Sequence, residues 1–272
     1  MLKDPAPIEE ADYLICESTY GKRLHQEKST PLELIKDVIY KACVQIPGRL
    51  IIPAFSVGRT QTLLFLLNQL QKKGELPKIQ IFTDSPLAKK STRIYDDFVS
   101  FMNEEAQAFC EEHNSLFDFE NLAYLENINS AEEIDNYGKP CIIITSSGMV
   151  RGGKSEEHIL RNLNNSYCTI LFIGYCSEGT LGRRLIDGLK TFRSGDEDIP
   201  VHARIISSDV LSGHGDLNDL LALFESQNIK RLKQIFLVHG EPDALEHLQG
   251  KVEGQGFEDV VIPQKGDPFV LD

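Results

Sequence analysis

Short apolar runs alternate with amphipathic stretches along most of the chain. The apolar runs predict buried strands at 12–16, 49–53, 79–83, 141–145, 169–173, 203–209 and 234–238. Apolar residues at helical spacing predict helices at 31–42, 59–73, 91–102, 104–113, 155–163, 217–226 and 242–252. Strands that alternate with helices pair in parallel through crossover connections. The pattern therefore predicts an α/β fold with mostly parallel sheets that are covered on both faces.

Local signals mark the ends of some of these elements. Thr30 followed by Pro31 is typical of a helix start, because Thr caps the first turn and Pro fits the first helical position. The polar residues 191–200 predict a hairpin or loop at a domain transition, and 203–209 is grouped with the C-terminal elements in a second α/β stretch. Residues 114–137 are polar and show little periodicity, so no element is predicted there.

Composition narrows the class of protein. The chain has 41 acidic and 28 basic residues, so its overall field repels polyanions, and a nucleic-acid site would need a local basic patch. No apolar run reaches the ~20 residues of a membrane helix, and no signal-peptide core follows Met1. Six cysteines without a CxxC pair predict reduced, buried thiols. We expect a cytoplasmic protein that is not bound to membranes.

Two histidines stand where chemistry is usually found. His239 follows a predicted strand and precedes a helix, so it lies at the carboxyl end of a strand, where α/β proteins collect their sites. His214 lies between two glycines, which allow a ligand to approach the backbone closely. A histidine at a strand end is often only a hydrogen-bonded structural residue. No HxH or HxxxH pair accompanies these two, so the metal-ligand set is incomplete.

A further motif matches a nucleotide-binding pattern. Residues Gly148–Ser155 fit the phosphate loop GxxxxGK[ST] between a strand and a helix, with Lys154 placed for the terminal phosphates. No later predicted strand ends in the aspartate that would hold magnesium, and the loop arrives late in the chain. A nucleotide-binding protein therefore remains one alternative.

The order of seven motifs resembles the β-CASP group of metallo-β-lactamase-fold RNA nucleases, which includes the cleavage and polyadenylation endonuclease and ribonuclease J. The motifs span nearly the whole chain. They are Ala11–Gly21 with Glu17-Ser-Thr-Tyr-Gly21, Ile52–Gln61, Ser85-Pro-Leu-Ala88, Ser147-Gly-Met149 with Gly152-Gly153, Gly174–Thr180, Ser212-Gly-His-Gly-Asp216 and Val238-His-Gly-Glu241.

The resemblance implies a role for each matching residue. Glu17 and His214 would be catalytic, the carboxylate holding an imidazole that points at the scissile phosphate, and His239 would be a metal ligand. A carboxylate beside an imidazole favours the protonated form, a proton donor for the leaving oxygen. The resemblance also implies two zinc ions, with manganese as the alternative metal, which would generate hydroxide and clamp the phosphate.

The family's HxHxDH signature is not found in the sequence. That signature, the next metal-binding histidine and the bridging aspartate precede the strand of Glu17 in the family, and this sequence begins about one loop before that strand. The expected domains are a metallo-β-lactamase strand at 1–21, an inserted β-CASP domain at 22–205, and a C-terminal metallo-β-lactamase segment at 206–272. We therefore expect part of a zinc-dependent RNA-processing nuclease that is inactive without a missing N-terminal half.

The resemblance also indicates a substrate surface. Turns that match the family motifs predict contacts with single-stranded RNA in a local basic cleft, where backbone phosphates dominate affinity. The expected substrate-binding residues are Arg59, Ser147, Gly148, Lys154 and Thr180. A third interpretation beside the nuclease and the nucleotide-binding protein is a non-catalytic RNA-binding or scaffold protein. Each of these proteins could form a homodimer.

Overall fold

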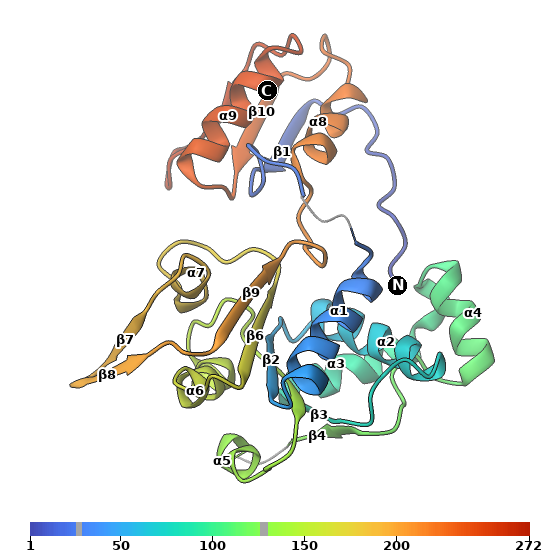
Figure 1. The fold of residues 1–272 in the computed structure, drawn as a ribbon. Helices are drawn as coiled ribbons and strands as arrows, with labels where there is room; N and C mark the ends of the chain where they lie inside the picture. Colours follow the sequence, from blue (N-terminus) through green and yellow to red (C-terminus); the bar gives the residue numbers. More distant parts are fainter. Residues whose placement is uncertain (26–28, 126–129) are drawn as a thin grey trace. The chain divides into compact units, whose positions relative to one another are not determined.

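The chain divides into two compact units (Figure 1). The computed structural model describes residues 1–25, 29–125 and 130–272. The larger unit comprises Met1–Asp4 and Glu27–Leu211, and the smaller unit comprises Pro5–Gln26 and Ser212–Asp272. Two segments far apart in the sequence therefore build the smaller unit.

The larger unit is built on a parallel sheet of six strands in the order β4-β3-β5-β2-β6-β9. The strands are β2 (Arg49–Pro53), β3 (Gln80–Asp84), β4 (Leu122–Tyr124), β5 (Cys141–Thr145), β6 (Cys168–Ile173) and β9 (Arg204–Ser208). The helices are α1 (Pro31–Ile39), the π-helical η1 (Tyr40–Gln45), α2 (Arg59–Lys72), α3 (Pro86–Asp97), the 3-10 turn η2 (Val99–Phe101), α4 (Glu104–His113), α5 (Ser130–Asp135), α6 (Gly153–Asn162) and α7 (Leu181–Ile186). A hairpin of β7 (Thr191–Ser194) and β8 (Glu197–Pro200) is antiparallel.

Helices cover both faces of this sheet, as the uninterrupted apolar strands predict. In β2, Leu50 and Ile52 join a core with residues of α1 and α2, while Ile51 joins a second core with residues of α6 and α7. Side chains alternate between the faces of a strand, so a strand covered on both faces must be apolar at every position. The α/β prediction is confirmed.

Three sequence expectations need correction. Helix α3 begins at Pro86 rather than at 91, because the Ser85 hydroxyl accepts from the Ala88 N–H and Pro86 occupies the first helical position. The stretch 114–137, for which no element was predicted, contains β4 and α5, and both are too short to show a period. Its residues 126–129 lie outside the described residues. Residues 203–209 contain β9, which pairs with β6 in the larger unit instead of joining the C-terminal elements.

The smaller unit has three parallel strands in the order β1-β10-β11. Its elements are β1 (Tyr13–Glu17), α8 (Leu217–Glu225), β10 (Gln234–Val238), α9 (Pro242–Glu253) and β11 (Val260–Val261). Helices α8 and α9 share a core with one face of the sheet, to which Leu14, Cys16 and Leu237 contribute. On the other face Ile15 is 72% exposed, and the ring centroids of Phe236 and Phe269 are 4.9 Å apart.

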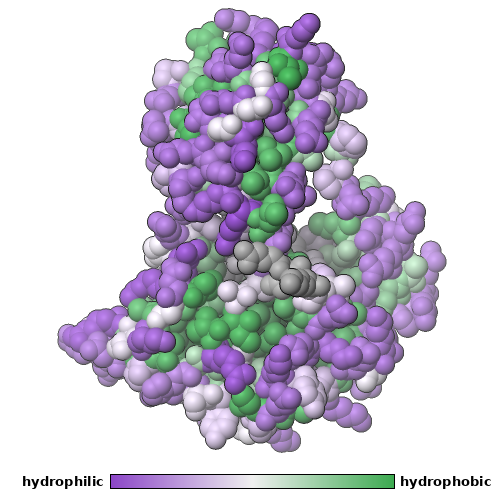
Figure 2. Space-filling model, turned by 45° about the horizontal axis from the view of Figure 1, so that its top comes forward, coloured by the Kyte–Doolittle hydropathy of each residue, from purple (hydrophilic) through white to green (hydrophobic). Residues whose placement is uncertain are grey.

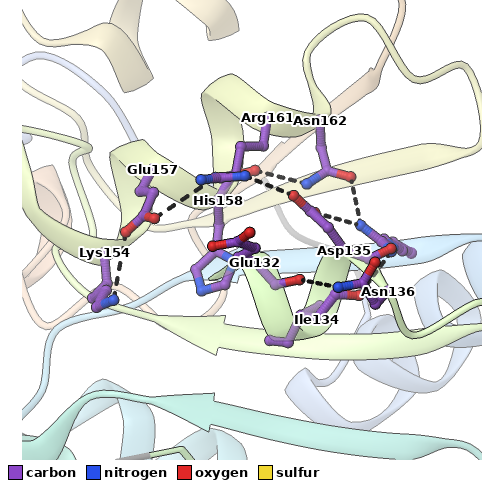
Figure 3. Close-up of polar contacts among 10 residues, drawn as sticks. Glu132, Ile134, Asp135, Asn136, Lys154, Glu157, His158, Arg161 and Asn162 are labelled. Atoms are coloured by element: carbon purple, nitrogen blue, oxygen red, sulfur yellow. Dashed lines mark hydrogen bonds and ion pairs between the residues drawn. The ribbon is translucent and has the colours of Figure 1, made fainter. Parts of the chain in front are cut away.

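An ion-pair network fixes helix α5 to the start of β2 and to α6 (Figure 3). The Arg49 guanidinium donates to the backbone oxygens of Ile134 and Asp135 and to the Asp135 carboxylate, at 2.8–3.0 Å. Arg161 of α6 donates to the other Asp135 oxygen at 3.0 Å. The last carbonyls of α5 are thus satisfied by a side chain from the sheet.

A buried pair links β3 to α6. His158 Nε2 lies 2.7 Å from an Asp84 carboxylate oxygen, and each side chain is at most 2% exposed. The pair ties α6, the helix after the Ser146–Gly153 turn, to the end of β3, where Asp84 lies opposite Thr145, the last residue of β5 before that turn.

The surface and the thiols agree with the composition. On the face shown in Figure 2, hydrophobic residues reach the surface in the middle of the larger unit and are surrounded by hydrophilic ones. All six cysteines are free, five of them buried and Cys110 partly exposed, as predicted. None of the helices in the described ranges combines the length and apolar character that a bilayer crossing needs.

Candidate active site

Two parallel strands bring the predicted catalytic residues together. In the register of β1 with β10, Glu17 lies opposite Val238, and His239 follows directly. The Ser18 N–H extends this ladder by donating to the His239 carbonyl at 3.4 Å. Because parallel strands end at the same edge of a sheet, residues more than 200 positions apart meet at one place.

Glu17 and His214 form the closest contact of the site. A Glu17 carboxylate oxygen lies 2.5 Å from His214 Nδ1, and both side chains are a little under one third exposed. The carboxylate fixes the orientation of the imidazole and leaves Nε2 free of this contact. The arrangement suits an acid or base that is held in place by its neighbour.

His239 completes the group. Its Nδ1 lies 3.9 Å from the same Glu17 oxygen, its ring stacks on His214 with centroids 5.3 Å apart, and its side chain is 66% exposed. The backbone of His239 has a φ of 53°, the left-handed region that non-glycine residues rarely adopt. Such strained positions cluster at functional sites, where surrounding contacts hold them.

Thr19 is a site residue that sequence reasoning missed. Its buried hydroxyl lies 2.6 Å from the Glu17 carboxylate, 3.3 Å from His214 Nδ1 and 3.1 Å from His239 Nδ1. One small side chain therefore touches all three predicted residues. Its position two residues after Glu17, in the same motif, was the available signal.

The loop of His214 is anchored by Asp216. The Asp216 carboxylate caps α8 by accepting from the Asn218 and Asp219 N–H groups, and it also accepts from the His25 N–H. Partial burial raises the pKa of Asp216, but these backbone donors outweigh burial and hold the pKa below its usual value. The loop that carries His214 and the chain that follows Glu17 are therefore tied at one carboxylate.

Glycine allows the two loops to approach. A Cβ on Gly240 would lie 2.7 Å from the Ser18 carbonyl oxygen and 2.9 Å from its Cβ, closer than such atoms come in proteins. The residue after His239 must therefore be small if the ends of β1 and β10 are to meet.

The donor set is suited to a metal ion. Glu17, His214 and His239 each offer one ligand atom, and these atoms lie within 4.8 Å of one another. Imidazole and carboxylate are zinc ligands, and a catalytic zinc usually has three protein ligands with one open position. The Glu17–His214 contact engages two of the three donors with each other, which leaves His239 as the most exposed ligand.

The predicted substrate-binding residues lie on turns after the strands of the larger unit. Arg59 begins α2, and its guanidinium lies against Gly174, where an added Cβ would meet it at 2.5 Å. Gly148 packs against Phe55, and the Ser147 hydroxyl accepts from the Arg151 N–H. The turns after β2, β5 and β6 thus contact one another at the carboxyl edge of the sheet.

Thr180 and Lys154, the remaining two of these residues, also have partners within the chain. Thr180 is 1% exposed, and its hydroxyl caps α7 by accepting from the Arg183 N–H. Lys154 lies 3.4 Å from the Glu157 carboxylate (Figure 3). Thr180 therefore acts on its turn as a cap.

The phosphate-loop pattern is engaged in local contacts. The Gly152 N–H donates to the Glu156 carboxylate and the Ser155 N–H donates to the Ser146 carbonyl. A phosphate loop offers such amides to its ligand. In this chain these two amides are occupied, and a helix cap is the role that the geometry favours.

Comparison with known families identifies the family of this chain. Residues 60–185 match the Beta-Casp domain, and residues 198–263 match the Zn-dependent metallo-hydrolase RNA specificity domain. The chain belongs to the β-CASP group of metallo-β-lactamase-fold RNA nucleases. This β-CASP chain contains both matched domains in the order that the sequence motifs predict.

Individual relatives support this assignment. An RNase J-like protein of Methanocaldococcus jannaschii is 31% identical over 89% of this chain and 55% of its own length. A ribonuclease of Thermus thermophilus is 27% identical over 98% of this chain and 60% of its own. Cleavage and polyadenylation specificity factor 73 of Drosophila melanogaster is 32% identical over 89% of this chain and 34% of its own. The β-CASP chain thus spans from a third to three fifths of these relatives.

Proposed function

We propose that this chain is part of a zinc-dependent nuclease that hydrolyses phosphodiester bonds of single-stranded RNA in the cytoplasm. The observation that carries the proposal is the meeting of Glu17, His214 and His239 at the ends of β1 and β10. The family match, the printed names of the relatives and the free thiols support it.

Each residue has a chemical task in this proposal. Glu17 and the Thr19 hydroxyl orient His214, and His214 gives a proton to the oxygen that leaves the phosphorus atom. His239 holds one metal ion. When bound, zinc would supply a hydroxide nucleophile and neutralise charge on the phosphate. Arg59, Ser147, Gly148 and Lys154 would position the RNA backbone, with Thr180 holding one of their turns.

The remaining metal ligands would come from a second metallo-β-lactamase part. The edge strand β1 supports this step, because Ile15 is 72% exposed on the face turned away from α8 and α9, whereas Phe236 on the same face is covered by Phe269. Glu17 shares the alternation of Ile15 along β1 and so points to the same side. A part that packs on this face would place its own ligands beside Glu17 and His239. The chain by itself is then inactive.

Complementation tests this function. The chain is mixed with, or fused to, a metallo-β-lactamase half that carries the HxHxDH ligands, and cleavage of labelled single-stranded RNA is measured with zinc or manganese. We expect activity only in the combination. His239→Ala should remove both metal loading and cleavage. His214→Ala should spare the metal and lower the rate by roughly 10²–10⁴-fold, the contribution of a general acid, and Glu17→Gln should have a milder effect.

The matched control is His202→Ala, since His202 is exposed and lies in the larger unit, outside the site. It should leave the reconstituted rate unchanged. An unchanged rate for His214→Ala, or full metal loading of His239→Ala, would overturn the roles assigned here.

A further inference from the structure

A second cavity lies within the larger unit, among residues that have no part in the proposed nuclease site. It has a volume of about 250 Å³ and opens between α3, the loop 115–119 and β4. Ligand pockets for drug-sized molecules are typically ~300–1,000 Å³. This cavity therefore has the size for one smaller ligand.

Aromatic residues form much of the wall of the cavity. Phe117 and Phe119 are 4% and 8% exposed, and Tyr124 lies beside them at the end of β4. Burial raises the pKa of Tyr124, so its phenol stays protonated and can donate a hydrogen bond at neutral pH. The Lys89 ammonium lies 5.7 Å from the centre of the Tyr124 ring. Phe117 and Phe119 are packed in the core, so of these three side chains the Tyr124 ring is the one that a flat ring could contact.

The loop that lines the cavity is held in one conformation. The Asp96 carboxylate accepts from the Ser115 hydroxyl and from the Leu116 N–H. The Ser115 hydroxyl in turn accepts from the N–H groups of Phe117 and Asp118, both at 3.1 Å. The Asp96 charge is therefore used within the protein, and the position of Asp118 is set before any ligand arrives.

Two charged side chains at this cavity, unlike that of Asp96, do not hold the loop in place. Within the described ranges, neither Arg93 nor Asp118 forms an ion pair or a side-chain hydrogen bond, and both are exposed. A ligand that satisfies both must offer acceptors on one side and donors on another. It must also tolerate an aromatic wall.

We propose that this cavity binds a single nucleotide, with a preference for guanine. A carboxylate only accepts hydrogen bonds, and the N1–H and N2–H₂ groups of guanine are neighbouring donors that Asp118 can accept. Arg93 and Lys89 can donate to the O6 and N7 acceptors of the base or to the phosphate. The ring would lie against the Tyr124 side chain.

The nucleotide could be free or could be one residue of an RNA strand. In the second case the inference rests on the proposed nuclease function, and in the first it does not. Neither case requires the metal site, so binding is measured in the presence of a chelator. Failure of the cavity and failure of the nuclease site are then separate results.

The test is calorimetric titration of the chain with GMP, AMP, UMP and ribose 5-phosphate. We expect one GMP per chain, with weaker binding of the other three. Asp118→Asn should weaken GMP binding about tenfold, the effect of a difference of ~1.4 kcal/mol, and should leave AMP binding unchanged. Arg93→Gln should weaken the binding of all three nucleotides.

Matched controls come from the same elements. Glu120→Gln alters an exposed acid of the same loop, and Lys90→Gln alters an exposed base of α3, and neither residue lines the cavity. Both should bind GMP as the parent chain does. Competition between GMP and a short oligouridylate with one internal guanosine would assign the cavity to RNA, and a lack of competition would assign it to free nucleotide. The proposal is overturned if no nucleotide binds at millimolar concentration, or if both cavity variants bind GMP as tightly as the parent chain does.

Discussion

At the scale of single residues, the site depends on a hydroxyl as much as on the residues with recognisable chemistry. Thr19 lies within hydrogen-bond distance of Glu17, His214 and His239. Its one proton is best used toward the Glu17 carboxylate at 2.6 Å, which leaves its oxygen to accept from an imidazole. Thr19 therefore positions the Glu17–His214 pair rather than acting on RNA itself.

Thr19→Val should slow the reconstituted nuclease while leaving its metal content intact. A hydrogen bond to a charged group contributes about 1.5–3 kcal/mol, so the expected loss in kcat is roughly 10- to 100-fold. The measurement is single-turnover cleavage of RNA together with metal analysis. Thr19→Ser keeps the hydroxyl and should restore most of the rate. Equal rates for Thr19→Val and the parent would contradict the positioning role.

At the scale of elements, the ends of helices hold the functional loops. Helix α8 begins at the Asp216 cap, which also accepts from the His25 N–H, so one carboxylate joins two segments of the smaller unit. In the larger unit, Arg49 and Arg161 both bind Asp135 and close the end of α5 (Figure 3). These contacts are local in space but join distant parts of the sequence.

Asp216→Ala should lower the free energy of unfolding by about 0.5–2 kcal/mol, the cost of losing a helix cap. The pKa of Asp216 lies below its ordinary value of 3.8. The stabilisation by the carboxylate is therefore present above pH 4 and is lost as the pH falls through the lower, folded-state pKa. Urea unfolding at pH 7 and at pH 3 should show the difference between Asp216→Ala and the parent shrinking at the lower pH. Glu225→Ala, at the other end of α8, is the control and should stay within about 0.5 kcal/mol at both.

Arg49 and Arg161 give a matched pair for the α5 network. The Arg49 side chain is 15% exposed and donates to two backbone carbonyls, whereas Arg161 is 41% exposed. Arg49→Gln should cost about 1–3 kcal/mol because the partly buried Ile134 carbonyl loses its charged donor, and Arg161→Gln about 0–1 kcal/mol. Urea unfolding measures both variants. A larger loss of unfolding free energy for Arg161→Gln would show that the Arg161–Asp135 ion pair, and not the contacts of Arg49, holds α5.

At the scale of the whole molecule, the chain contains two units with different roles in the proposed enzyme. The acid and the metal ligand lie in the smaller unit, and the predicted RNA-contacting turns lie in the larger one. In the smaller unit, the edge strand β1 exposes Ile15 on the same side as Glu17 of the ligand cluster. A stable metal centre should therefore require a further protein part.

The chain alone should bind zinc poorly. Of the three donors, Glu17 and His214 contact each other at 2.5 Å, and the one remaining imidazole, that of His239, would hold zinc weakly compared with a full set of ligands. Elemental analysis after dialysis against a weak chelator should give well under one zinc per chain. Two metals that remain bound after dialysis would contradict the need for a second part.

The sequence by itself determined the α/β class and the family, and it named the three residues that the structure brings together at one sheet edge. Apolar strands and amphipathic helices are local patterns that burial imposes on each segment, and the Glu17, His214 and His239 motifs could be recognised one at a time. Parallel pairing followed because short strands that alternate with helices have few other ways to be covered. The strand range 234–238 was confirmed to the residue.

Only the tertiary structure decided how these pieces combine. The placement of β9, the role of Thr19 and the meeting of Glu17 with His239 depend on strand order and register, which no local pattern contains. The cap role of Thr180 and the engaged amides of the Gly148–Ser155 turn depend on which donors and acceptors come within 3 Å or so of each other. The cavity beside Tyr124 exists because α3, a loop and the edge strand β4 leave space between them. The sequence gives the chemistry of each side chain, but packing sets the distance between residues that are remote in sequence.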